Sequence, residues 1–415
     1  MENNRITMLK GPDRVRLRPS VFFGSDGIEG VLQSIKAIFD IVSTEAVMGY
    51  CEKINVRIHK DNSVSIHSWD RGLLIDETMY DGFPEWHYDF CELYGKPHKT
   101  DDYVFLSSFT RCTHLYDKQE KTLPKYPLDE EYHLEISFTQ CVSEFMNVIS
   151  IRDGIKKTLS FRKGHSVLDL KKEASNDESS TYIHFKPDHD VFTDTNLPIN
   201  RIRNMIRGRA VCISGIEFNL CDERSEINET YYYPEGIEGY AKALTVPEIP
   251  LFVKEIETTG RDRYNRKDYD ARVKIYFGFS SENAQVGCFH NYRVLQNGGS
   301  HLDEVKEKIA NNINWEFNEN FLRGTFLSPE DIYEARRKAD FSFDELEGHI
   351  ILILESNCSD GASCWMYPTR TAITNRMITD MANDLIGKEF DEYLSCNHKE
   401  ILSILKEIDA TRPKN

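Results

Sequence analysis

The pattern of apolar and polar side chains predicts a long amphipathic helix from Glu29 to Gly49. Its apolar positions recur at steps of three and four residues and form one core-facing stripe, made of Val31, Ile35, Ile38, Val42 and Ala46. A second, polar stripe holds Gln33, Lys36, Asp40 and Ser43, and a third face holds Ala37, Ile41, Thr44 and Met48. Gly49 suits the end of the helix, because glycine adopts the left-handed conformation at low cost.

Alternation of apolar and polar residues predicts strands after this helix. In the first half we expect strands at 53–59, 63–68, 144–151 and 155–167, and from Thr181 onward; a charged loop at 171–180; a helix at 196–208; and a strand at 212–222. The first domain is then expected to end near Arg224.

The second half opens with a polar, turn-rich stretch, NETYYYPEGIEGYAKAL. We expect strands near 271–279 and 284–292, a helix from NGGSH to residue 311, a helical turn at 328–340, a buried strand at 348–356, and helices at 374–393 and 398–408. The continuous apolar run GHIILILES supports the buried strand.

Composition describes an ordinary globular chain, with 40% hydrophobic and 29% charged residues. No apolar run approaches the roughly 20 residues that a membrane helix needs, and the N-terminus lacks the apolar core of a signal peptide. The ten cysteines include no C-x-x-C pair, so we expect buried thiols in a reducing compartment rather than disulfides or a zinc site. These features predict a cytoplasmic protein that does not enter membranes.

The net charge of −17 counts against a broad DNA-binding surface, because affinity for duplex DNA depends on cations that neutralise phosphates. Two local basic strips remain: Lys10, Arg14, Arg16 and Arg18, and Arg201, Arg203, Arg207 and Arg209. We expect carboxylates of the protein itself to be their main partners. DNA contact is then indirect or confined to these strips, and a protein partner is favoured.

Six local motifs follow one another in the order found in the B subunits of bacterial type II topoisomerases. They are LKGPDRVRLRP, EAVMGYCEKINVRIHKDNSVSI, STYIHFKPDHDVF, YYYPEGI, CFHNYRVLQNGGSHLDEV and PEDIYEA. Through these motifs the chain resembles the family of DNA gyrase B and topoisomerase IV ParE. Each motif is weak alone, but their unshuffled order is a strong indication of the fold.

The resemblance implies an α+β fold with two domains. The first, at 1–224, would be a GHKL-type ATPase domain, in which helices cover one face of a mixed sheet. The second, at 225–397, would be a ribosomal-S5-like α/β transducer domain, followed by a C-terminal helix and tail at 398–415. The sequence holds no E-G-D-S-A element of the family's metal-binding Toprim domain.

Family members hydrolyse ATP with residues of the first helix, in the motif E-x-x-D-N-x-x-D-E-A. With Glu45-Ala46 as the anchor, the general base falls on Ala37 and the Mg²⁺ ligand falls on Ile41. The aspartate between them is kept as Asp40. Neither an alanine nor an isoleucine can deprotonate water or bind a metal, and loss of a general base alone costs about 10²- to 10⁴-fold in rate. We therefore expect no catalytic and no metal-binding residue at these two positions.

The family's D-D-G-R-G-I-P motif places an aspartate on the adenine amino group. Matching Arg71-Gly72 puts Ser68 at that position. Asp70 lies two residues further on, about 6.6 Å along an extended strand, and is expected to be a poor substitute. The resemblance retains Gly72 and the adenine-side threonine, Thr181, as candidate nucleotide-binding residues.

Three further parts of the family's ATP site have weak counterparts. The glycine-rich lid would fall on residues 105–111, which contain no glycine to approach a phosphate closely. The transducer motif Q-T-K matches Arg370-Thr371-Ala372, so Arg370 is the candidate for contacting an anion. The N-terminal arm, Met1–Lys10, has no tyrosine to reach a partner's nucleotide.

Three hypotheses remain open. The first is a non-hydrolysing paralogue that needs no cofactor and binds a topoisomerase or gyrase subunit, or itself, as a scaffold or regulator. The second is an ATP- and Mg²⁺-dependent topoisomerase component in which Asp40, Glu45, Asp70 and Arg370 replace the lost residues. The third is a protein that binds a nucleotide or small ligand beside Ala37, Ile41 and Thr181 without hydrolysis.

Overall fold

The structure is a computed structural model, and it describes residues 11–76, 84–93, 134–261, 268–280, 282–322, 340–358, 363–366 and 371–412. The chain forms two compact units, Met1–Pro234 and Glu235–Asn415. Their division lies later than the boundary expected near Arg224, because the strand that follows Arg224 pairs within the first unit.

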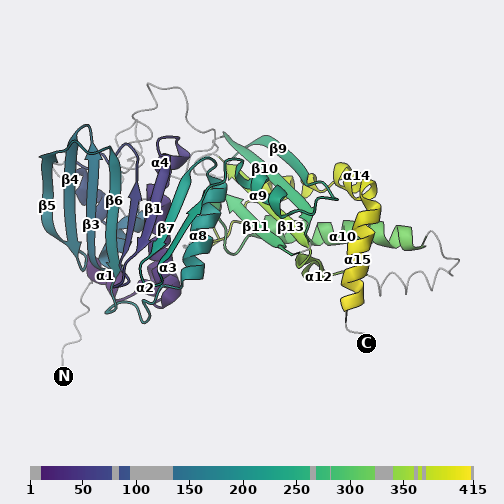
Figure 1. Ribbon diagram of the computed structural model, residues 1–415, viewed down its shortest axis with the longest axis horizontal. Helices are drawn as coiled ribbons and strands as arrows, with labels where there is room; N and C mark the ends of the chain where they lie inside the picture. Colours follow the sequence, from purple (N-terminus) through teal and green to yellow (C-terminus); the bar gives the residue numbers. More distant parts are fainter. Residues whose placement is uncertain are drawn as a thin grey trace. The chain divides into compact units, whose positions relative to one another are not determined.

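The first unit contains an eight-stranded mixed sheet in the order β5-β4-β3-β6-β2-β1-β7-β8 (Figure 1). Its strands are β1 (Lys53–Ile58), β2 (Val64–Ser68), β3 (Ser143–Arg152), β4 (Ile155–Arg162), β5 (His165–Ala174), β6 (Ser180–Pro187), β7 (Glu217–Asp222) and β8 (Ile227–Tyr231). Neighbouring strands are antiparallel except β1 and β7, which are parallel. The sheet thus brings segments far apart in sequence, such as β2 and β6, side by side.

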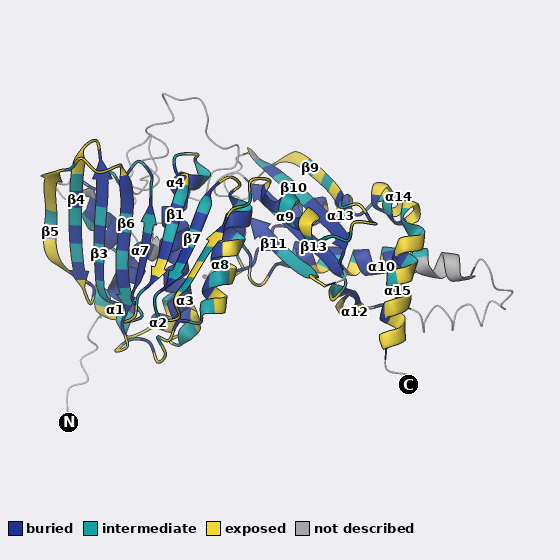
Figure 2. Ribbon diagram, in the orientation of Figure 1, coloured by how far each residue is buried: buried dark blue, intermediate teal, exposed yellow. Residues whose placement is uncertain are grey.

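Helices of the first unit pack on this sheet through one shared apolar core. They are α1 (Pro12–Arg16), α2 (Pro19–Phe23), α3 (Ile28–Val42), α4 (Thr44–Val47), α5 (Glu85–Phe90), α7 (Leu134–Cys141) and α8 (Ile199–Cys212). Several strands alternate between buried and less buried residues along their length, as β7 does (Figure 2). The mixed sheet with helices packed on it confirms the predicted α+β fold of this half.

Helix α3 lies deep in this core and begins one residue before the predicted start. Gly30 lets the first turn of the helix lie against the preceding loop. Any other residue would place its Cβ 2.1 Å from the carbonyl oxygen of Ser25. The helix ends at Val42, and α4 continues to Val47 before Gly49 adopts a φ of 79°. The predicted core stripe is confirmed, and the polar stripe is buried as well.

Two stretches that the sequence predicts as loop or turn contain strands of the first unit. The charged loop expected at 171–180 is in part the second half of β5, which extends to Ala174. The turn-rich stretch NETYYYPEG contains β8, which pairs with β7 from Asp222↔Ile227 to Phe218↔Tyr231. Both are edge strands, so a polar, weakly alternating sequence suffices because one side of each faces solvent.

The second unit contains a five-stranded sheet in the order β12-β11-β13-β10-β9. Its strands are β9 (Phe252–Arg261), β10 (Asp268–Phe279), β11 (Gln285–His290), β12 (Arg293–Val294) and β13 (Ile350–Cys358), and its helices are α9 (Gly236–Leu244), α10 (Ser300–Leu322), α12 (Phe343–Glu347), α13 (Arg376–Leu385), α14 (Lys388–Cys396) and α15 (His398–Thr411). The buried strand predicted from GHIILILES is β13. Most of the helical turn predicted at 328–340 lies outside the described residues.

Helix α15 belongs to the second unit rather than to a separate tail. Ile401, Leu405 and Ile408 recur at helical spacing and are buried in the unit's core. Among the described residues, no helix is long and apolar enough to cross a membrane. The described cysteines are all free thiols; four of them are buried, as predicted, whereas Cys364 and Cys396 are exposed.

Candidate functional site

The site expected for ATP chemistry lies along α3 and the end of β2. On α3, Ala37 and Ile41 are each only 1% exposed and stand where the resemblance places the general base and the metal ligand. Ile41 is part of the apolar core of the first unit. Neither side chain has a polar atom to offer, so this face of α3 provides neither a proton acceptor nor a metal ligand.

Asp40, the acid kept between these two positions, is held by two cations. Lys36 lies one helical turn earlier, with its Nζ 2.9 Å from Oδ2 of Asp40, and Arg209 of α8 pairs with Oδ1. All three side chains are almost completely buried. A carboxylate enclosed by a lysine and an arginine is already neutralised, so a divalent cation would have to displace both.

Glu45, the anchor of the helix motif, is bound to the loop that follows β2. Arg71 donates through Nε to Oε2 at 2.7 Å and through Nη2 to Oε1 at 2.9 Å. The same guanidinium stacks on Tyr50, with its Cζ 3.5 Å from the ring centroid. This two-point contact fixes the loop against α4 and occupies both oxygens of the carboxylate.

Asp70, Ser68 and Thr181 come together at the end of β2. Ser68 pairs with Thr181 across the β2–β6 ladder, and the Thr181 hydroxyl donates to Oδ1 of Asp70 at 2.9 Å. The spacing of about 6.6 Å assumed for an extended strand therefore does not apply to Asp70. Whether Asp70 can bind an adenine amino group stays a prediction. Strand β2 ends at Ser68, so the next two residues turn out of the strand and bring the carboxyl group back to Thr181.

The surroundings of Asp70 favour its neutral form. Burial raises the pKa of this carboxyl group to about 7, and the nearby charge of Glu45 contributes in the same direction. Hydrogen bonds from the Gly72 amide, at 2.8 Å, and from Thr181 oppose the shift. The group is thus poised to titrate near neutral pH and to accept or donate one hydrogen bond.

Gly72 fits tightly between this cluster and β3. It has a φ of 73°, and a Cβ at this position would lie 2.3 Å from the carbonyl oxygen of Ile151. Arg152, a buried residue at the end of β3, donates to the Gly72 carbonyl at 2.7 Å. Arg152 is not among the residues predicted from the sequence; its local signal is a cation between a predicted strand and an Asp-Gly turn.

Several of the remaining candidate positions fall outside the residues that the structure describes. Arg370, the lid counterpart at 105–111 and the arm Met1–Lys10 lie outside the described residues. Thr371, next to Arg370, accepts a hydrogen bond at its carbonyl from the Asn297 amide at 2.9 Å. Whether Arg370 contacts an anion therefore stays a prediction.

Four arginines of the two basic strips have carboxylate partners, as expected for the strips. In the second strip, Arg201 binds Glu29 through two contacts of 2.8 Å, Arg203 binds Glu229, and Arg209 binds Asp40. In the first strip, Arg16 pairs with the buried Asp188 at 2.6 Å. Most of the arginines placed in these strips therefore hold the fold together.

The described part of the first unit thus has the α3 and β2–β6 elements on which the resemblance places an ATP site, with apolar side chains at positions 37 and 41. In this part, Asp40 of α3 and Glu45 of α4 are both engaged by arginines. The adenine-side cluster retains one carboxyl group, Asp70, with Thr181 and Ser68 beside it. Chemically, this arrangement can hydrogen-bond a small polar group but lacks a placed water-activating base.

No family model matches the chain. Among curated proteins, it is 26% identical to the DNA gyrase B protein of Clostridium acetobutylicum over 314 residues, which is 75% of this chain and 45% of that protein. It is also 22% identical to the DNA gyrase B protein of Thermotoga maritima over 412 residues, which is 98% of this chain and 59% of that protein. The chain spans about half the length of these relatives.

A solved structure of a gyrase B domain has a fold similar to that of this chain. The 43K ATPase domain of Thermus thermophilus gyrase B, in complex with an aminocoumarin, superposes with a TM-score of 0.58 at 21% identity and covers 96% of this chain and 94% of its own. This likeness in fold extends through both units. In sequence and in fold, the chain is thus similar to gyrase B, the B subunit of a type II topoisomerase.

Proposed function

We propose that this topoisomerase B-subunit-like protein does not hydrolyse ATP and acts as a binding partner, scaffold or regulator in DNA topology. The observation that carries the proposal is the state of α3. Ala37 and Ile41 are buried and apolar, and the one acid between them, Asp40, is enclosed by Lys36 and Arg209.

Hydrolysis needs a carboxylate that can take a proton from water and a ligand for Mg²⁺. Glu45 would have to break two hydrogen bonds to Arg71 before it could act as a base. Asp40 would have to release two buried cations before it could bind a metal. Both steps oppose the alternative hypothesis of an active ATPase with substituted residues, so we propose that ATP and Mg²⁺ are not cofactors.

A second candidate function is binding of a nucleotide or small ligand without turnover. It is favoured by the cluster of Asp70, Ser68 and Thr181, because a buried carboxyl group and two hydroxyls can recognise an amino group of a purine-like ring. This function is compatible with the first, since a bound ligand can order a domain that performs no chemistry.

The relatives suggest what kind of partner this chain binds, since two of them are B subunits of DNA gyrase. We propose a protein partner of that kind, or a second copy of this chain, and a cytoplasmic location. The net charge of −17 and the engagement of most placed arginines in ion pairs support contact with DNA that is indirect.

The decisive experiment measures phosphate release from ATP by the purified chain, with and without DNA and with candidate partner proteins added. We expect no turnover above a protein-free blank. A rate that disappears in Glu45→Gln but persists in Glu52→Gln, a matched change at an exposed glutamate, would overturn the proposal.

Thermal unfolding with ATP, ADP and adenosine tests the second candidate. Binding through the Asp70 cluster predicts a rise in melting temperature that is lost in Thr181→Val. The absence of a shift with all three compounds would remove this candidate but leave the first one intact. Affinity purification from the source cell then identifies the partner.

A further inference from the structure

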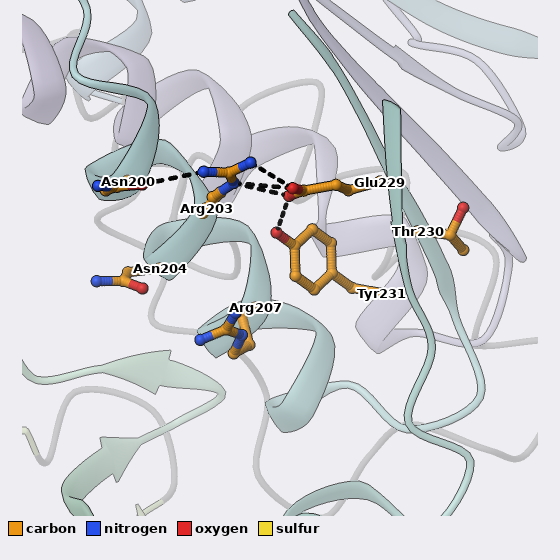
Figure 3. A pocket seen from close by; sticks show the side chains of 7 residues that line it. All are labelled: Asn200, Arg203, Asn204, Arg207, Glu229, Thr230 and Tyr231. Atoms are coloured by element: carbon orange, nitrogen blue, oxygen red, sulfur yellow. Dashed lines mark hydrogen bonds and ion pairs between the residues drawn. The ribbon is translucent and has the colours of Figure 1, made fainter. Parts of the chain in front are cut away.

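A groove of about 680 Å³ lies beside the last strand of the first unit (Figure 3). One wall is the polar face of α8, and the other is the end of β8. It is lined by Asn200, Arg203, Asn204, Arg207, Glu229, Thr230 and Tyr231. None of these residues belongs to the α3 site, so the groove is a separate feature of the surface.

The groove follows the free edge of a sheet. Strand β8 pairs with β7 on one side, and within the described ranges no strand pairs with its other side. The edge of a sheet presents unpaired backbone N–H and C=O groups, which can bind another extended segment. A helix beside such an edge forms a slot that holds the side chains of an added strand.

The floor of the groove is rigid. Glu229 accepts two hydrogen bonds from Nε of Arg203, at 3.0 and 2.9 Å, and one from the Tyr231 hydroxyl, at 2.6 Å (Figure 3). Burial and the Glu229 carboxylate raise the pKa of Tyr231 to about 12, so its hydroxyl stays protonated and donating at neutral pH. The acid in the groove is thereby neutralised by groups of the protein itself.

Arg207 supplies the remaining charge. It is exposed, lies along the same helix face as Asn200 and Asn204, and has its Cζ 5.8 Å from the Tyr231 ring centroid. In the part of the chain that the structure describes, no carboxylate pairs with it, in contrast to Arg201, Arg203 and Arg209 of the same helix. One guanidinium flanked by two amide side chains suits one carboxylate ligand.

We propose that this groove binds an extended peptide segment of a partner protein, which adds to the edge of β8 and places one acidic side chain on Arg207. A single cation outside an ion pair is too little for a nucleic-acid backbone, which needs several phosphate contacts. The overall charge of −17 also disfavours a strongly acidic segment, so backbone pairing provides most of the contact. Tyr232, which is 55% exposed, offers an apolar surface next to the strand.

The test uses the full chain and a displayed library of random seven-residue peptides. We expect the selected peptides to share an aspartate or glutamate between β-branched or aromatic residues. A synthetic peptide of the consensus, measured by fluorescence anisotropy, should bind about tenfold more weakly to Arg207→Ala than to the unchanged protein. Arg201→Ala, which removes an arginine already paired with Glu29 on another face, should bind as tightly as the unchanged protein.

Two further measurements separate strand addition from a simple ion pair. N-methylation of the peptide amides one at a time should weaken binding at every second position, because only alternate amides point to the edge of β8. Replacing the peptide's acid by its amide should have no added effect in Arg207→Ala. Three results would each overturn the proposal. The first is a set of selected peptides without a shared acid, and the second is an effect of N-methylation that does not alternate along the peptide. The third is binding of a twelve-nucleotide thymidine oligomer that depends on Arg207.

This inference does not rest on the loss of ATP hydrolysis, since an active enzyme can carry the same groove. Failure of peptide binding therefore leaves the proposal about hydrolysis untouched. A melting temperature equal to that of the unchanged protein in both arginine variants excludes misfolding as the cause of lost binding.

Discussion

Arg71 holds both carboxylate oxygens of Glu45, at 2.7 and 2.9 Å, across the junction between α4 and the loop that follows β2. The glutamate lies in the helix motif of a family that hydrolyses ATP, and in this chain it joins two structural elements. The same holds for Asp40, which ties α3 to α8. Acids that the resemblance associates with a nucleotide site thus stabilise the fold, and this role can be measured.

Glu45→Gln should lower the free energy of unfolding by about 2 kcal/mol, because a mostly buried guanidinium loses its charged partner. Arg71→Met should have a similar effect, and the double variant should be less destabilised than the sum of the two. Urea denaturation of the four proteins gives the coupling energy. Additive effects would mean that the contact contributes little to stability.

Asp40→Ala should be the most destabilising change near the site, by about 3–5 kcal/mol, since it leaves Lys36 and Arg209 buried without their carboxylate. The exposed pair of Arg201 and Glu29 provides the control, and Glu29→Ala should cost less than about 1 kcal/mol. Denaturation curves of both variants check this. Equal effects would show that Asp40 is not the centre of a buried ion cluster.

Asp70→Asn should stabilise the protein at high pH. The folded pKa of about 7 lies above the ordinary value of about 3.9, so the stability that Asp70 contributes is fully present below pH 4 and is lost as pH rises to 7. Asparagine keeps an oxygen for the Gly72 and Thr181 donors without carrying charge. We expect a gain of up to about 4 kcal/mol at pH 8 and little change at pH 4. A gain that does not depend on pH contradicts the assignment.

The second unit should lose stability in mild acid. Burial lowers the pKa of His290 to about 3, with a contribution from His301, and burial lowers the pKa of His301 to about 4. Both folded values lie below about 6.5, so stability is present above that pH and falls as the unfolded chain gains protons below it. At pH 5.5 each histidine should cost about 1 kcal/mol.

Hydrogen exchange of β13 amides at pH 7.5 and pH 5.5, corrected for intrinsic rates, measures this loss. The double variant His290→Gln, His301→Gln should retain less of the pH dependence than the unchanged protein. His189, whose side chain is 73% exposed, is the control, and His189→Gln should leave the profile as it is. An unchanged pH dependence in the double variant would show that other groups cause the acid sensitivity.

Residue order and periodicity predicted much of the fold of this chain. The amphipathic stripe of α3, the apolar run of β13 and the alternation in β1 and β2 are local patterns, and each appears close to its expected range. Strand β8 and the end of β5 were missed because edge strands need no strong alternation. The apolar residues at positions 37 and 41 were also visible in the sequence, since a helix register follows from spacing alone.

The partners of the polar residues depended on the tertiary structure. Asp40 meets Arg209 because α8 packs near α3, and Asp70 meets Thr181 because β6 pairs with β2 and the chain turns after Ser68. The groove on β8 exists because that strand is last in the sheet. Local spacing determines which face of an element a residue occupies, whereas contacts between distant segments follow from strand order and helix packing. The sequence by itself therefore determined the resemblance to gyrase B and the apolar residues at positions 37 and 41, and only the tertiary structure decided what the charged side chains bind.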